Sequence, residues 1–258
     1  MDWTPVSYAY DGSFAGFLTC VFASYAHREE PMSFSTPEDG RISLWPERTV
    51  DTDEARAQRV YRSLAPRLGQ EGRRLAVYGF LTCLEERELH LWRFLRLGYD
   101  RGPWVVRDRT DDRVAVLTRA VGHLTGEAQL LKGFTRFSEQ EGVLVGEIAP
   151  KNRVLPLLRP HFCARYPEES FVLYDRTHRE ALFYRPRRWA IVPLEAFRAA
   201  APGREERDFR RLWRRFYDTI AIEGRENPRC RMTQMPKRFW GTMTEFQNET
   251  EERKELAP

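Results

Sequence analysis

The sequence predicts an α+β fold, because its apolar residues change their period near Lys132. Before this residue they recur every three to four positions, as on the buried face of a helix, and after it they alternate, as in a strand. A wide apolar stripe over 205–222 then returns to the helical period. We therefore expect a mainly helical region over 1–131, an antiparallel sheet region over 132–192, a C-terminal helix with a basic strap over 193–245, and a frayed tail over 246–258.

The helical region opens with a turn and a helix. Asp11-Gly12-Ser13 forms the turn, and Ser13 is suited to cap a helix whose apolar residues begin at Phe14. Such a strand–turn–helix junction could present backbone N–H groups to an anion, although Asp11 adds negative charge there. The alternative is an ordinary cap over a buried helix.

Further helices are expected before Lys132. They follow an exposed excursion over 31–46, rich in Pro, Ser and Gly, which holds one short strand at Ile42-Ser43-Leu44. The helical spacing covers 53–68, 75–97 with a break near 83–85, and 114–131.

The sheet region is predicted from two hairpins and one short helix. The first hairpin pairs 133–138 with 143–148, the second pairs 170–175 with 181–185, the helix covers 153–165, and 187–192 could add a fifth strand. This β-β-α-β-β order predicts an antiparallel sheet with a helix on one face.

One face of the first predicted strand alternates basic and aromatic groups. Lys132, Phe134 and Arg136 share this face because side chains alternate along a strand. An open sheet with this pattern can stack nucleic-acid bases. The alternative is that Phe134 or Phe137 faces the core.

The helix over 205–222 carries arginines beside its apolar stripe, which must be docked against the domain. Together with the segment that follows, they could form a continuous positive surface, the alternative being a solvated amphipathic face. These arginines are Arg207, Arg210, Arg211, Arg214 and Arg215.

The segment after this helix mixes cations, amides and aromatics without a helical or strand period. Two X-Pro turns, at Asn227-Pro228 and Met235-Pro236, are expected to stiffen it. Guanidinium and ammonium groups beside an indole suit phosphate contacts and base stacking, with Arg238 and Trp240 as the central pair. The alternative is a strap that packs on the domain. The residues predicted to bind nucleic acid are Lys132, Arg136, Arg185, Arg187, Arg188, Asn227, Arg229, Arg231, Gln234, Lys237, Arg238 and Trp240.

Composition restricts the function further. The 258 residues, 41% of them hydrophobic, can bury a sizeable core. The net charge is +4, and only four of the 42 basic residues are lysines, so the cations are chiefly arginines, which bind phosphate and stack on bases. A GC-rich coding sequence is the alternative reason for this excess. The chain has no apolar run near the roughly 20 residues of a membrane span and no signal sequence, so we expect a cytoplasmic protein without membrane contact.

The cysteines and the catalytic motifs give no sign of a cofactor. Cys20, Cys83, Cys163 and Cys230 lack C-x-x-C spacing, which predicts reduced thiols and no metal. Neither a P-loop nor a nucleophile-elbow or zinc-peptidase motif occurs.

Three motifs resemble a bacterial family described as probable DNA metabolism or repair proteins: Tyr10-Asp11-Gly12-Ser13-Phe14, residues 131–137 and residues 226–240. The resemblance covers nearly the whole chain. Members are typically encoded beside a radical-SAM protein assigned to DNA modification or repair, and some are fused to a uracil-DNA-glycosylase-like domain. The resemblance implies DNA and this radical-SAM protein as partners. Because the chain lacks the three closely spaced cysteines of a radical-SAM cluster, it would be the companion of that enzyme.

Three functions follow from these observations. The first is an accessory protein that binds single-stranded or opened DNA for the radical-SAM partner. The second is a base-acting, glycosylase-like enzyme, for which Asp11, His161 and Glu223 are candidates that no spacing ties together. The third is a protein-interaction scaffold that never contacts nucleic acid. Whether the chain is an enzyme stays open.

Overall fold

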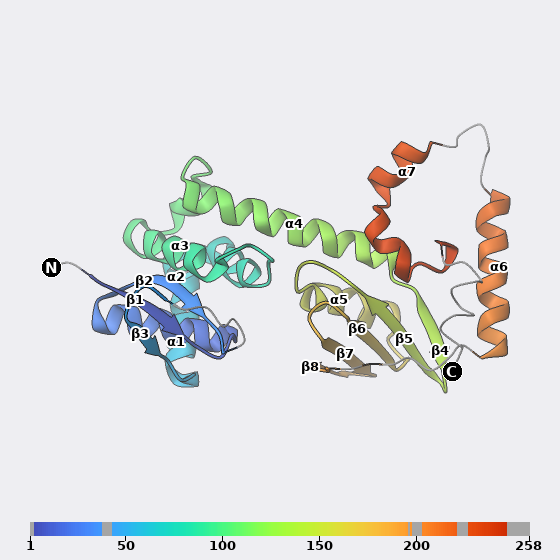
Figure 1. Ribbon diagram of the computed structural model, residues 1–258, viewed down its shortest axis with the longest axis horizontal. Coiled ribbons are helices and arrows are strands. Elements are labelled where there is room, and N and C mark those ends of the chain that lie inside the picture. Colours follow the sequence, from blue (N-terminus) through green and yellow to red (C-terminus); the bar gives the residue numbers. More distant parts are fainter. Residues whose placement is uncertain (1–2, 38–42, 196, 198–202, 221–226, 247–258) are drawn as a thin grey trace. The chain divides into compact units, whose positions relative to one another are not determined.

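The computed structural model describes residues 3–37, 43–195, 197, 203–220 and 227–246. The chain forms two compact units, Met1–Leu124 and Thr125–Pro258, which we call unit 1 and unit 2 (Figure 1). Both combine helices with a sheet, so the predicted α+β class is confirmed. No helix among the described residues is long and apolar enough to cross a membrane.

Unit 1 contains a small parallel sheet, of which the sequence predicted only the strand that precedes Asp11. Its strands are β1 (Thr4–Ala9), β2 (Glu29–Ser35) and β3 (Glu47–Thr49), in the order β2-β1-β3. The strand predicted at Ile42-Ser43-Leu44 is wrong for Ser43 and Leu44, while Ile42 lies outside the described residues. β2 carries two glutamates and a proline without strict alternation, so its strand conformation depends on pairing with β1.

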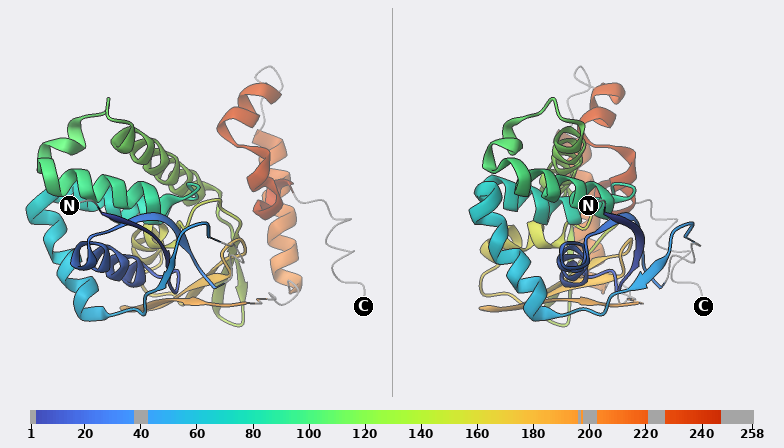
Figure 2. Two further views of the ribbon diagram at one scale, coloured as in Figure 1. Left: turned by 60° about the vertical axis from the view of Figure 1, so that its left-hand side comes forward. Right: turned by 90° about the vertical axis from the view of Figure 1, so that its left-hand side faces the viewer.

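Helix α1 (Phe14–His27) connects β1 to β2 and packs between the sheet and α2 (Glu54–Phe80; Figure 2). The predicted cap is present, because the Ser13 hydroxyl accepts a hydrogen bond from the Gly16 N–H at 2.9 Å. Gly69, with φ 75° and ψ 172°, interrupts α2 next to the predicted helix end at 68. Non-helical angles of this kind are easily adopted only by glycine.

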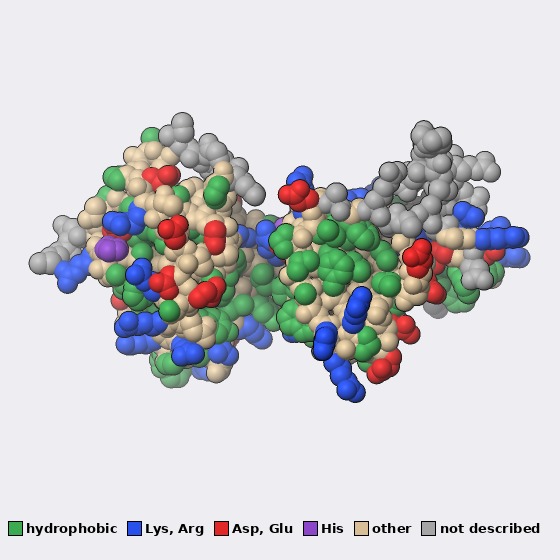
Figure 3. All heavy atoms as spheres, turned by 90° about the horizontal axis from the view of Figure 1, so that it is seen from below, with side chains coloured by type: hydrophobic (Ala, Val, Ile, Leu, Met, Phe, Trp, Pro, Cys, Tyr) green, Lys and Arg blue, Asp and Glu red, His purple; other side chains and the backbone are tan. Residues whose placement is uncertain are grey.

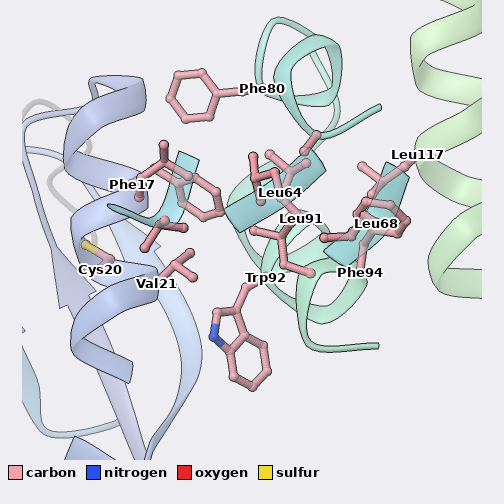
Figure 4. Packing of buried hydrophobic residues seen from close by; sticks show 14 of the residues in the cluster. Phe17, Cys20, Val21, Leu64, Leu68, Phe80, Leu91, Trp92, Phe94 and Leu117 are labelled. Carbon is pink, nitrogen blue, oxygen red and sulfur yellow. The ribbon is translucent and has the colours of Figure 1, made fainter. Parts of the chain in front are cut away.

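The core of unit 1 lies between these helices and α3 (Arg87–Arg101), followed by the 3₁₀ helix η1 (Pro103–Arg107) and the first half of α4 (Asp112–Phe134). Phe17, Leu64 and Leu91 meet there (Figure 4), and all three are buried. Trp92 is buried beside them and donates its indole N–H to the Ser24 hydroxyl at 3.0 Å. These residues come from the helical periods that the sequence displays.

Unit 2 is built on a five-stranded sheet in the order β4-β5-β6-β7-β8. Its elements are β4 (Phe137–Gln140), β5 (Val143–Ile148), α5 (Leu155–Arg165), β6 (Phe171–Asp175), β7 (Glu180–Arg185) and β8 (Arg188–Pro193). The order of strands and helix follows the prediction, but β5 and β6 are parallel, unlike the other three pairs. The reason is that α5 carries the chain back across the sheet, and such a crossover joins parallel neighbours.

Helix α4 extends further than the sequence period indicates. The Thr135 hydroxyl and N–H both donate to the Leu131 carbonyl, at 2.7 and 3.0 Å, so helical hydrogen bonding continues past Gly133. The strand predicted over 133–138 is therefore mostly wrong. Lys132 and Phe134 lie in α4, and Arg136 lies in the connection to β4.

The C-terminal part contains α6 (Arg204–Ile220), α7 (Pro228–Gln234) and the 3₁₀ helices η3 (Lys237–Thr242) and η4 (Thr244–Phe246). The segment predicted to lack regular structure thus forms short helical turns, which are too brief to display a period. Residues 221–222 of the predicted helix and 247–258 of the predicted tail lie outside the described residues.

Candidate nucleic-acid interface

Helix α5 packs on one face of the sheet of unit 2, and the other face carries exposed side chains. On the covered face, Phe171, Leu173 and Leu182 are buried, and Phe162 of α5 packs near Phe171. On the opposite face, strand register aligns Ser138, Val145, Val172, Phe183 and Ala190 in one row across all five strands. Figure 3 shows hydrophobic side chains gathered on this side of the sheet, with basic side chains at the border.

Phe183 is the largest exposed side chain in this row, with 38% of its surface accessible. Its neighbours across the strands are Val172, which is half-buried, and Ala190, which is exposed. A flat aromatic ring on a surface of small apolar groups has the shape of a stacking platform for a base. We call Val145, Val172, Phe183 and Ala190, with Arg185 and Arg188, the open platform.

The basic border of the platform is formed by the turn between β7 and β8. Arg185 and Arg188 face each other across this turn, two residues along from Phe183 and Ala190 on the same side of the sheet. Arg187 lies at the tip of the turn with φ 67°. All three arginines are exposed, and none forms an ion pair with any residue that the structure describes. Guanidinium groups in this state are available to phosphate.

The opposite end of the platform is covered by an aromatic contact. Tyr174 is buried there, with its ring 5.2 Å from that of Phe197. Glu147, on the same face, pairs with Arg176 at 3.1 Å. The uncovered end, which carries Arg185 and Arg188, is therefore the one at the β7–β8 turn.

A second pair of an aromatic residue and an arginine lies on the other face of the sheet, at its β8 edge. Trp189 is exposed on the α5 side of β8, and the Arg159 guanidinium lies 4.0 Å from its ring centroid. This cation–π contact holds the indole beside a positive charge.

Arg238, in contrast, is engaged by a buried carboxylate. Its guanidinium lies 3.1 Å from Glu127, whose side chain is only 2% exposed. The same carboxylate accepts hydrogen bonds from the Lys151 N–H at 3.0 Å, the Asn152 N–H at 2.9 Å and the Asn152 side-chain amide at 2.6 Å. Arg238 supplies the positive charge that a buried carboxylate requires.

Arg136 has a similar structural partner. It donates two hydrogen bonds, of 2.6 and 3.3 Å, to the carboxylate of Glu245, whose side chain is also buried. A bidentate arginine–carboxylate contact is strong and directional. Lys132 lies near Gln129, with 3.4 Å between the ammonium and the amide oxygen. The basic face that the sequence predicted on a first strand therefore does not form.

Trp240 packs within the C-terminal segment. Its indole N–H donates to the Met235 carbonyl at 2.9 Å, and its ring stacks on Phe246 with centroids 4.4 Å apart and planes 14° apart. Arg231 and Lys237 lie within 6 Å of the same ring. The neighbouring Phe239 is buried and 5.5 Å from Phe134. These contacts favour the strap alternative for the segment.

The other predicted contacts are spread over the C-terminal segment. Asn227, Arg229, Gln234 and Lys237 are exposed there. Lys237 and Arg238 belong to η3, which packs against β5, whereas Arg185–Arg188 form a turn at the β8 edge (Figure 1). Arg185–Arg188 and the predicted residues of the C-terminal segment therefore lie on different elements of unit 2.

The N-terminal motif is also accounted for by local packing. The Tyr10 hydroxyl donates to Glu88 at 2.8 Å, and burial together with this carboxylate raises the pKa of Tyr10. Asp11 accepts from the Ser13 N–H at 2.9 Å and from the Thr52 hydroxyl at 2.6 Å. Burial raises the pKa of Asp11, but the hydrogen bonds from Thr52 and Ser13 outweigh it and leave this pKa below its usual value. A carboxylate that already occupies the turn argues against an anion site.

The remaining catalytic candidates do not form a site. His161 lies in α5 with its Nε2 buried and unbonded, and burial, followed by the charges of Lys132 and Arg165, lowers its pKa. Glu223 lies outside the described residues. Among the residues that are described, no group of three His, Cys, Asp or Glu could hold a metal.

The platform could have been found from the sequence. Side chains alternate along a strand, so in the predicted strand over 181–185 Phe183 must lie on the side of Arg185, opposite Leu182 and Tyr184. The sequence reasoning included Arg185 and missed Phe183. It placed the stacking face at Phe134 instead, in a segment where the spacing of apolar residues fits either a helix or a strand.

Comparison with known proteins identifies a family. Residues 85–245, which include α3, α4 and nearly all of the described part of unit 2, match the model of a family described as a domain of unknown function, DUF4130. No curated protein matches the chain.

Proposed function

The chain belongs to the DUF4130 family, and we propose that it is a nucleic-acid-binding protein that holds a single-stranded or opened strand on the open platform of unit 2. The observation that carries the proposal is the exposed Phe183 ring on the same sheet face as Arg185 and Arg188. This arrangement combines a stacking surface with two cations, each two residues along its strand from Phe183 or Ala190.

The chemistry favours unpaired bases over a duplex. Bases within a duplex are stacked on each other, so a ring such as Phe183 can stack only on a base that has left the helix. The adjacent arginines would then contact the phosphates on either side of that base. Their freedom from carboxylate partners among the described residues is consistent with this role.

The role of the bound strand rests on the resemblance described above. We propose that the chain presents opened DNA to a radical-SAM partner, as an accessory protein in DNA repair or modification. A protein-binding platform is the alternative, since Val145 and Val172 are apolar. The three exposed arginines of the β7–β8 turn, which form no ion pair with a described residue, favour the nucleic acid, because their clustered charge attracts phosphates.

Fluorescence anisotropy with a labelled single-stranded oligonucleotide tests the proposal. Phe183→Ala should weaken binding by about 1–3 kcal/mol, or roughly 5- to 150-fold. Arg185→Ala and Arg188→Ala should each weaken binding and lower the slope of log K against log salt by about 0.7. Duplex of the same sequence should bind more weakly.

Two control variants match these changes. Arg93→Ala removes one exposed arginine from unit 1, and Leu44→Ala removes an exposed apolar side chain. Neither should alter the salt slope. Unchanged affinity in Phe183→Ala, with the salt slope also unchanged in both platform arginine variants, would rule out the platform as the binding site.

A further inference from the structure

Helix α6 exposes an apolar stripe that the fold of unit 2 does not cover. Phe209, Leu212 and Phe216 are 68%, 60% and 53% exposed, and their spacing places them on one face of the helix. The sequence predicted this stripe to be docked, so the exposure corrects that expectation. Apolar patches of this kind on a soluble chain mark an interface.

One flank of the stripe contacts other elements of unit 2. The Arg210 guanidinium donates to the Ser138 hydroxyl at 2.6 Å, and the Trp213 indole N–H donates to Glu245 at 3.3 Å. The Trp213 ring lies beside that of Phe216, with centroids 5.9 Å apart, so these contacts hold the flank of the stripe and leave Phe209, Leu212 and Phe216 exposed. The exposed stripe is therefore a consequence of how α6 is held.

We infer that this stripe binds the same stripe of a second copy of the chain, as an antiparallel pair of α6 helices. A two-fold axis near Leu212 sets Phe209, three residues before it, against the partner's Phe216, four residues after it. Leu212 meets the partner's Leu212 on the axis. The stripe is thus complementary to itself, as a two-fold interface requires.

The charges beside the stripe fit the same arrangement. Asp208 and Arg215 are seven residues apart and lie on one flank, two helical turns from each other. Antiparallel pairing brings Asp208 beside the partner's Arg215 twice, whereas parallel pairing would oppose like charges. Asp208 now pairs with Arg211 at 2.6 Å, but both side chains are exposed, so this pair costs little to rearrange.

The apolar area of the stripe sets the expected affinity of the dimer. Its three side chains offer roughly 300 Å² of apolar area per copy, since a large side chain exposes about 150–250 Å² when free. This area is small for a permanent dimer. We therefore expect a reversible dimer with a dissociation constant in the micromolar range.

Sedimentation velocity of the full chain across the micromolar range tests the inference. The wild-type chain should pass from monomer to dimer as its concentration rises. Leu212→Glu should remain monomeric, because it places two carboxylates on the axis. Leu44→Glu, a matched change at an exposed leucine of unit 1, should dimerise normally. Circular dichroism would verify that both variants keep their helix content.

A charge exchange defines the orientation. Asp208→Arg and Arg215→Asp should each weaken the dimer by roughly tenfold. The double variant restores opposite charges across the interface and should recover most of the loss. A wild-type chain that stays monomeric, a dimer indifferent to Leu212→Glu, or a double variant weaker than both single variants would overturn the inference.

Discussion

Glu127 is predicted to be the polar residue on which the stability of unit 2 depends most. Its carboxylate receives three hydrogen bonds from residues 151 and 152 and the ion pair from Arg238. Glu127→Ala removes the common acceptor of these three hydrogen bonds, from the backbone N–H groups of Lys151 and Asn152 and from the Asn152 side-chain amide. Each unsatisfied buried donor costs about 1–3 kcal/mol. Water reaches the site only partly, because Asn152 is itself buried. We expect a loss of roughly 3–5 kcal/mol, the range for breaking a buried ionic network.

Urea unfolding of the full chain, followed by circular dichroism, measures this loss. Glu127→Gln should cost less than Glu127→Ala, since the amide keeps one acceptor oxygen while its N–H₂ group opposes a donor. Glu169→Ala removes an exposed carboxylate from the same unit and should change the free energy of unfolding by less than about 0.5 kcal/mol. The reasoning is refuted if Glu127→Ala behaves like Glu169→Ala.

Three further predictions concern the strap and the N-terminal turn. Trp240→Ala should destabilise the chain by about 1–3 kcal/mol in urea unfolding, because it loses the stack on Phe246 and one hydrogen bond. It should leave single-strand binding unchanged. Weaker binding with normal stability would instead support the base-stacking role that the sequence predicted for Trp240. Gly16→Ala should lower the melting temperature, because a Cβ there would lie 2.2 Å from Asp11 Oδ1 and 2.8 Å from Thr52 Oγ1; an unchanged melting temperature would show that the turn adapts. The pKa of Asp11 is lowered in the fold, so its stabilisation is present above the unfolded-state pKa and is lost as the pH falls through the folded pKa. Asp11→Asn should therefore lose less stability on acidification than the wild type does, and parallel pH profiles would contradict this.

The elements that the sequence predicted well are those with a local cause. The Ser13 cap, the break between α2 and α3, and the hairpin of β6 and β7 each depend on residues within a few positions of one another. The boundary at α4 and β4 failed for the opposite reason. Phe134 and Thr135 fit a strand by composition, but the contact of Phe134 with Phe239 favours the helix.

The parallel sheet of unit 1 was also missed because its strands pair over long distances in the sequence. β2 and β3 pair with β1 across intervals that include a whole helix or a long excursion. Strand pairing over such separations depends on contacts that no local period records. The parallel pairing of β5 with β6 was missed similarly, because the path of the crossover through α5 decides it.

What the sequence determined by itself is the class of the fold and the chemical character of the surface. The change of period at Lys132, the turn residues, and the excess of arginine near aromatic residues are all properties of the linear chain. Only the tertiary structure decided which of these arginines are available to a ligand. Arg136 and Arg238 are held by the buried carboxylates of Glu245 and Glu127, while Arg185 and Arg188 remain beside the exposed Phe183. Ion pairing acts over a few ångströms, and residues distant in the chain come that close only in the folded state.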